Sequence, residues 1–93
     1  MTALARSFHA DIYVTLKRMV NDPEGIEILH GLHNLGYEGV DEVRSGKYLQ
    51  LQVTAGTEEE ARRQVDEMCE RLLCNTVIEE FRVDISQTNN YEH

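Results

Sequence analysis

A strict alternation of apolar and polar residues over positions 8–16 constrains the fold more than any other feature of this chain. The segment reads FHADIYVTL, and every second residue is apolar: Phe8, Ala10, Ile12, Val14 and Leu16. A period of two residues is typical of a β-strand with one buried and one exposed face. We therefore expect a half-buried strand over residues 8–16.

A helix start follows this strand. Asp22 precedes Pro23, which places a preferred N-cap residue before the one helical position where proline costs nothing. Apolar residues recur as far as Leu35, and Gly36 follows them, so we expect a helix over about 23–35. Its apolar arc covers roughly 180°, wider than one sheet contact requires, which leaves part of the helix for another subunit.

Three more elements follow in the sequence. Residues 40–45 and 47–53 predict a hairpin of two short strands, with its tight turn around Ser45 and Gly46. Thr57 and Glu60 form a capping box at the start of an amphipathic helix that reaches about residue 74. Residues 77–85 alternate again and predict a fourth strand.

The resulting order, βαββαβ, predicts an α+β fold. We expect a two-layer, ferredoxin-like plait in which a four-stranded antiparallel sheet carries both helices on one face. A single domain is expected over residues 1–85, with a polar C-terminal tail over 86–93. The open face of the sheet should carry polar, largely uncharged side chains and two aromatic rings: His9, Tyr13, Thr15, Tyr48, Gln50, Gln52 and Arg82. A face of this kind is usually half covered by a partner.

The charge balance argues against polyanionic partners. The 93 residues include 17 Asp and Glu against 9 Lys and Arg, a formal net charge of −8. Such a chain repels nucleic acid and anionic membrane surfaces on average. Because no long apolar run or signal peptide is visible, we expect a cytoplasmic protein that binds neither nucleic acid nor membrane.

The chemistry-bearing residues do not form a recognisable active site. Lys47 follows Gly46, but the remaining phosphate-loop positions are absent. His30 and His33 are spaced for one helix face, yet no third metal ligand is close in sequence. Cys69 has no recognisable activating partner and is expected near the core. We therefore expect no catalytic residue, no bound cofactor and no metal in this chain.

Four stretches of the sequence together resemble one family. They are DPEG at 22–25, LGY at 35–37, VRSGKY at 43–48 and CERLLCNTVIE at 69–79. In this order and spacing they resemble the PurS family, the small subunit of phosphoribosylformylglycinamidine synthase, over about residues 8–85. Cys74 and Thr76 depart from the usual LLANPVIE of that family without removing an essential group.

The resemblance implies a subunit that assembles an enzyme without performing its chemistry. In the family, the synthetase subunit PurL uses ATP and Mg to activate formylglycinamide ribonucleotide, and the glutaminase subunit PurQ releases ammonia. The small subunit, as a homodimer or homotetramer, bridges the two and supports ammonia transfer in the fourth step of de novo purine biosynthesis. The candidate partner contacts are Arg44, Gly46, Lys47, Tyr48, Tyr13 and Asn75.

Two other classes of function remain as alternatives. A plait of this size also serves as a regulatory domain that binds a small metabolite at a dimer interface. An RNA-binding plait would stack bases on aromatic side chains, but Tyr48 lacks the further aromatic positions of that class. Glutamine-dependent product formation in the presence of both partner subunits distinguishes the first function from these two.

Overall fold

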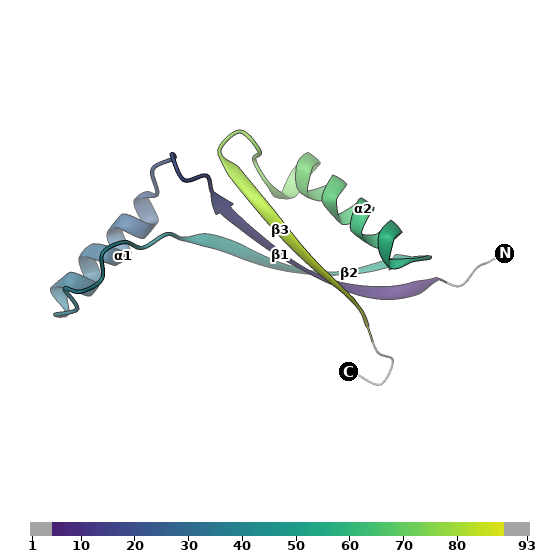
Figure 1. Ribbon diagram of the computed structural model, residues 1–93, viewed down its shortest axis with the longest axis horizontal. Helices are drawn as coiled ribbons and strands as arrows, with labels where there is room; N and C mark the ends of the chain where they lie inside the picture. Colours follow the sequence, from purple (N-terminus) through teal and green to yellow (C-terminus); the bar gives the residue numbers. More distant parts are fainter. Residues whose placement is uncertain (1–4, 89–93) are drawn as a thin grey trace.

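The computed structural model describes residues 5–88 and contains a three-stranded sheet and two α-helices (Figure 1). Residues 1–4 and 89–93, and with them most of the expected tail, lie outside the described residues. The elements in chain order are β1 (Arg6–Leu16), α1 (Pro23–Asn34), β2 (Gly46–Ala55), α2 (Glu58–Met68), the π-helical turn η1 (Cys69–Leu73) and β3 (Glu79–Gln87).

The first strand lies in the centre of the sheet. The strand order is β2-β1-β3, and β1 is antiparallel to both neighbours. Phe8, Ala10, Ile12 and Val14 are fully buried on one face, as the alternation predicts. Because side chains directly opposite each other in an antiparallel pair point to the same face, this register also fixes the faces of β2 and β3.

Helix α2 covers the apolar face of the sheet. Thr57 accepts a hydrogen bond from the Glu60 backbone N–H, which is the expected cap. Ala61, Val65 and Cys69 follow at intervals of four residues and are fully buried against the sheet. The helix continues as a π-helical turn to Leu73, so its predicted extent is confirmed, although its last turn is wider than an α-helical one.

The α+β class, the antiparallel sheet and the two helices are confirmed, but the four-stranded sheet is wrong. Residues 40–45 form no strand, and β2 is one continuous strand instead of the second arm of a hairpin. The backbone of this segment forms hydrogen bonds with side chains instead of with a neighbouring strand. The Val40 carbonyl lies 2.8 Å from His33 Nε2, and the Ser45 N–H donates to Asp22 at 2.6 Å.

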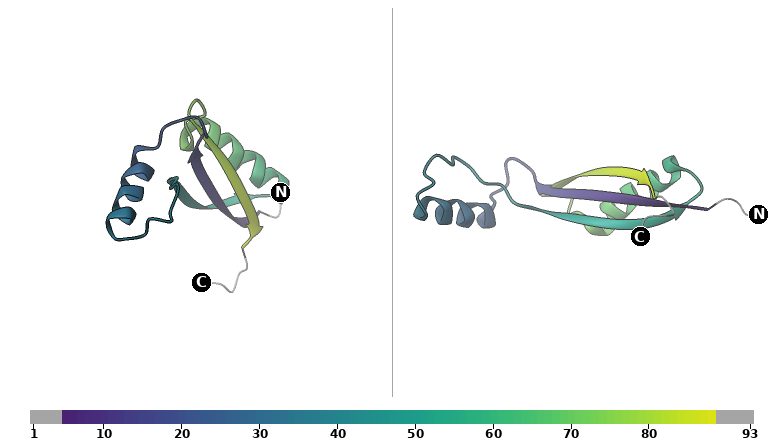
Figure 2. Two further views of the ribbon diagram at one scale, coloured as in Figure 1. Left: turned by 60° about the vertical axis from the view of Figure 1, so that its left-hand side comes forward. Right: turned by 90° about the horizontal axis from the view of Figure 1, so that it is seen from below.

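Helix α1 is the second difference from a plait. It projects beyond the end of the sheet and does not lie beside α2 on the apolar face (Figures 1 and 2). The molecule therefore extends over 60 × 33 × 15 Å, and its radius of gyration is 17.7 Å. A compact domain of this length has a radius of gyration of about 12 Å. We call α1 and the segment that returns from it, residues 23–45, the arm.

The sheet extends beyond the expected end of the domain. Strand β3 includes Ser86 and Gln87, which the sequence places in the tail, and the Thr88 N–H donates to the Ser7 carbonyl at 2.9 Å. None of the helices among residues 5–88 is long and apolar enough to cross a membrane.

The packing of α2 predicts a large difference between two valine-to-alanine substitutions. Val65 is fully buried, whereas Val77 is 79% exposed. We expect Val65→Ala to lower the free energy of unfolding by about 2 kcal/mol, because it removes two buried methyl groups and leaves a cavity. Val77→Ala should change it by less than about 0.5 kcal/mol. Urea denaturation of both variants checks this, and equal losses would contradict the assigned core.

Candidate functional site

The arm is joined to the sheet through the carboxylate of Asp22. This side chain is 3% exposed and caps α1 by accepting a hydrogen bond from the Gly25 N–H at 2.9 Å. It also accepts from the backbone N–H and the hydroxyl of Ser45, at 2.6 and 2.8 Å. These hydrogen bonds, led by that from the Ser45 backbone, lower the pKa of Asp22. One carboxylate thus connects the start of α1 to the start of β2.

Arg44 and two glycines complete this junction. The Arg44 guanidinium donates to the carbonyls of Lys17 and Val20, at 3.0 and 3.1 Å. A β-carbon at Gly25 would collide with the Val43 carbonyl, and one at Gly46 would lie 2.5 Å from the Val14 carbonyl. Both glycines are therefore required by close approach of two backbones.

An open hollow lies at the same junction. Its cavity volume is about 530 Å³, and Asp22, Glu24, Ser45, Lys47 and Glu79 contribute its polar lining. It has one lysine against three carboxylates, which does not favour an anionic ligand.

Aromatic and charged side chains form a row across the open face of the sheet. Tyr13 on the central strand is directly opposite Tyr48 on β2 and Arg82 on β3. The two tyrosine rings stack with centroids 5.2 Å apart and an interplanar angle of 25°, and the Arg82 guanidinium carbon lies 4.3 Å from the Tyr13 centroid. Stacked rings with a cation above them form a rigid, solvent-facing surface with both apolar and polar groups.

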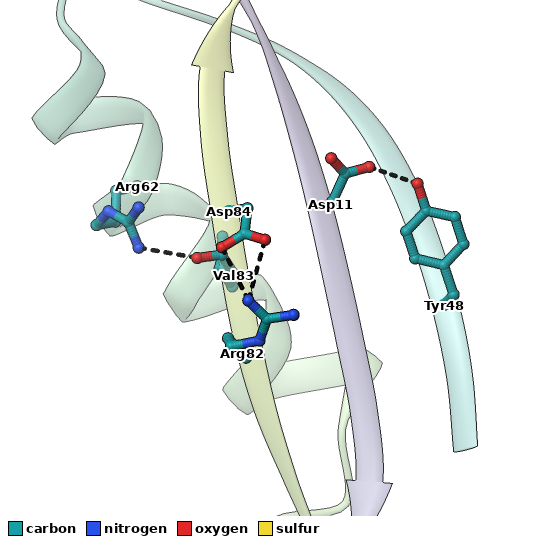
Figure 3. A network of polar contacts seen from close by, with 6 residues as sticks. All are labelled: Asp11, Tyr48, Arg62, Arg82, Val83 and Asp84. Carbon is teal, nitrogen blue, oxygen red and sulfur yellow. Dashed lines mark hydrogen bonds and ion pairs between the residues drawn. The ribbon is translucent and has the colours of Figure 1, made fainter. Parts of the chain in front are cut away.

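Hydrogen bonds fix the orientation of this row (Figure 3). The Tyr48 hydroxyl donates to Asp11 at 2.6 Å, and this bond lowers the pKa of Asp11 and raises the pKa of Tyr48. Arg82 donates to both carboxylate oxygens of Asp84, at 3.1 and 3.3 Å. The row is therefore held in place before any partner arrives, which reduces the entropy lost on binding.

The described residues contain no obvious reaction centre. No group of three or more His, Cys, Asp or Glu side chains among residues 5–88 is placed to hold a metal ion. Cys69 and Cys74 are both buried and unpaired with each other. Burial raises the pKa of Cys69 to about 11, so its thiol is protonated at neutral pH and is a poor nucleophile.

Comparisons with known proteins decide the family. Residues 9–87 match the family described as PurS, phosphoribosylformylglycinamidine (FGAM) synthase. The chain belongs to the PurS family. The PurS subunit of phosphoribosylformylglycinamidine synthase from a Synechocystis species is 46% identical over 84 residues, which cover 90% of this chain and 84% of that protein.

Solved PurS structures share the fold. The PurS subunit of phosphoribosylformylglycinamidine synthase from Thermotoga maritima superposes with a TM-score of 0.82 at 33% identity, covering 90% of this chain and 97% of that one. A chain in the structure of PurLQS from the same organism has a TM-score of 0.79 at 35% identity, with 86% of this chain and 98% of that chain covered.

The structure separates the candidate contacts of this PurS chain into three places: the open face of the sheet, the junction with its hollow, and the corner between η1 and β3. Tyr13 and Tyr48 lie together on the open face of the sheet. Arg44 and Gly46 belong to the junction, where Arg44 bonds within the chain instead of pointing to a turn surface. Lys47 is exposed beside the hollow.

Asn75 lies apart, in the corner between η1 and β3. Its carbonyl accepts from the N–H groups of Ile78 and Glu79, and its side chain accepts from the Val77 N–H at 3.2 Å. These bonds shape the corner. Whether any of the six candidates touches a partner stays a prediction.

Sequence reasoning missed two residues of these sites. Ser45 was assigned to a hairpin turn, although it is the main partner of Asp22, which lies 23 positions away. Asp11 was not singled out, although it anchors Tyr48. A usable signal did exist for Asp11, because it stands on the same face as Tyr13 within the alternating segment.

The junction predicts an acid-dependent loss of stability. Because the folded-state pKa of Asp22 is lowered, its carboxylate adds stability above the ordinary aspartate pKa, and that stability is lost as the pH falls through the folded-state value. As the pH is lowered below about 4, we expect the unfolding free energy of Asp22→Asn to fall less than that of the unsubstituted chain. Urea denaturation from pH 7 to acid measures this. An unchanged acid profile would show that the carboxylate charge is not used at the junction.

Proposed function

We propose that this chain is the non-catalytic assembly subunit of a phosphoribosylformylglycinamidine synthase. In this role it bridges a synthetase subunit, PurL, and a glutaminase subunit, PurQ, in the fourth step of de novo purine biosynthesis. Membership of the PurS family and similarity to a chain in the PurLQS structure support the proposal. The single observation that carries it is the prearranged open face around Tyr13, which has a binding surface's features but no reactive group.

The proposed division of labour leaves the chemistry to the partners. PurL uses ATP and Mg to activate the ribonucleotide amide, and PurQ releases ammonia from glutamine. Ammonia passed between two active sites must be kept from protonation and from loss to water. A subunit that holds the two sites in register and excludes solvent therefore controls the coupled rate through geometry alone.

Two surfaces suit this role. The open face offers the rigid Tyr48, Tyr13 and Arg82 row, and aromatic and arginine side chains are enriched at the energetic centres of protein interfaces. The arm offers exposed apolar side chains away from the core, among them Ile26, Ile28, Leu35 and Tyr37. An extended molecule with apolar residues on a projecting helix is expected to be covered by other chains.

The proposal includes self-association as a homodimer or homotetramer in the cytoplasm. Only one helix, α2, covers the apolar face of the sheet, whereas two helices cover it in a two-layer plait. A thin molecule of this kind buries little apolar surface by itself, and association with further copies increases the buried area.

Reconstitution with purified partners tests the assembly role. With PurL, PurQ, ATP, Mg, glutamine and the ribonucleotide present, we expect omission of this chain to abolish product formation from glutamine. Product formation from added ammonia should persist, because the proposal assigns the amide activation to PurL and free ammonia makes transfer from PurQ unnecessary. A glutamine-dependent rate that is the same with and without the chain would rule out the assembly role and favour a separate regulatory one.

The open face predicts a difference between two arginine-to-alanine substitutions. Arg82 stacks on Tyr13, whereas Arg63 is exposed on α2, which packs on the other face of the sheet. We expect Arg82→Ala to lower the glutamine-dependent rate about tenfold at limiting subunit concentration, by weakening partner binding. Arg63→Ala should leave the rate within about twofold. Equal rates for the two variants would remove the open face from the interface.

A further inference from the structure

We propose that Cys69 and Cys74 are a reversible disulfide-forming pair, in which oxidation joins the end of α2 to the corner that leads into β3. These two residues are the only cysteines of the chain, and in the structure both thiols are free. The inference concerns a modification site, and it does not depend on the proposed function.

The π-helical turn η1 brings the two cysteines together. On a regular α-helix, residues five positions apart point about 140° away from each other around the axis. Here the Cys74 N–H donates to the Cys69 carbonyl at 2.9 Å, which places the fifth residue above the first. Standard bond lengths then keep the two Cα atoms less than about 7 Å apart. A disulfide can span that separation.

The two side chains are buried in the same place. Cys69 is fully buried, Cys74 is 6% exposed, and both belong to the apolar cluster between the helix and the sheet. Burial raises the pKa of Cys69, and the neighbouring Asp66 and Cys74 raise it further. Two thiols that share one cluster at this backbone separation meet the requirement of a disulfide for direction as well as for distance.

Cys74 is the thiol that reacts first. It lies at the corner, nearer to solvent than Cys69. Burial and Glu79 raise the pKa of Cys74, but Lys47 and Lys17 lower it. Burial raises the pKa of Cys69 to about 11. Because the thiolate is the attacking species, Cys74 is the better nucleophile of the two, and the exchange is slow at neutral pH.

The reaction is a thiol–disulfide exchange with a small-molecule disulfide of the glutathione class. The Cys74 thiolate attacks one sulfur of that disulfide, which forms a mixed disulfide and releases one glutathione thiolate. The Cys69 thiolate then attacks the Cys74 sulfur and releases the second glutathione. The protein thiols lose two electrons to the external disulfide, and their two protons pass to the departing thiolates. A dithiol reductant reverses both steps.

The crosslink fixes the corner that carries Asn75. In the reduced chain this corner is held by short-range hydrogen bonds, from the Glu79 N–H to the Asn75 carbonyl at 2.7 Å and from the Asn75 N–H to the Glu79 carboxylate at 2.8 Å. Leu72 and Val77 are exposed beside it. A covalent bond across η1 limits local opening of this segment. In a reducing compartment such a pair responds to redox conditions and is not a permanent crosslink.

Tryptic mapping of the full-length chain tests the pair directly. Trypsin cuts after Arg71, which places Cys69 on the peptide 64–71 and Cys74 on the peptide 72–82. After incubation of the folded chain with glutathione disulfide and alkylation of the remaining thiols, we expect these peptides to be linked and to separate on treatment with a dithiol. The intact monomer should lose two hydrogen atoms, and its free thiols should fall from two to zero.

Two alanine substitutions separate the roles of the cysteines. In Cys69→Ala the mixed disulfide at Cys74 cannot be resolved, so a glutathione adduct should accumulate. In Cys74→Ala only the fully buried thiol remains, and its adduct should form at least about tenfold more slowly. Mass spectrometry of both variants measures the two rates. Equal rates would contradict the assignment of Cys74 as the attacking thiol.

The measurement on the unsubstituted chain does not depend on either variant folding. Two thiols that stay free in the folded chain, a crosslink that forms only after unfolding in urea, or a disulfide between copies in place of the internal one would overturn the proposal. None of these results would affect the reconstitution test, in which the requirement for this chain is measured directly.

Discussion

The carboxylate of Asp22 is the interaction on which the shape of this molecule depends. It caps α1 and at the same time accepts two hydrogen bonds from Ser45, so the arm leaves and re-enters the sheet at one point. Three donors compensate the burial of the charge, as a buried carboxylate requires. The close approach of the two segments also excludes side chains at Gly25 and Gly46. The DPEG and VRSGKY stretches are therefore two halves of one contact.

This constraint explains why the molecule is not a plait. In a plait, the segment after the first helix returns as an edge strand and the helix lies on the sheet. Here Ser45 is bonded to Asp22, and His33 is bonded to Val40, so the returning segment follows α1 instead of β2. The arm then projects, one helix covers the apolar face, and the edge of β2 stays unpaired within the chain.

Local patterns in the sequence determined the parts of the structure that depend on neighbouring residues. The alternation around Ile12 predicted β1 and its faces, and the cap at Thr57 predicted the start of α2. The alternation within each of the three segments placed Tyr13, Tyr48 and Arg82 on one face, but their stacking depends on a register that brings together three strands distant in sequence. The strand predicted over residues 40–45 does not form, because this segment is held by side-chain hydrogen bonds to residues elsewhere in the chain. Such bonds leave no periodic signal in the sequence.

As an assembly subunit, this PurS chain is a structural component of an enzyme and is needed in a fixed ratio to its partners. The most direct measurement is a titration of the chain into fixed amounts of PurL and PurQ while the glutamine-dependent rate is followed. An assembly subunit predicts a rate that rises linearly and then stops at a fixed molar ratio to PurL, with no turnover by the chain alone. Full activity at a small fraction of that ratio, or product formation by the isolated chain, would contradict the account.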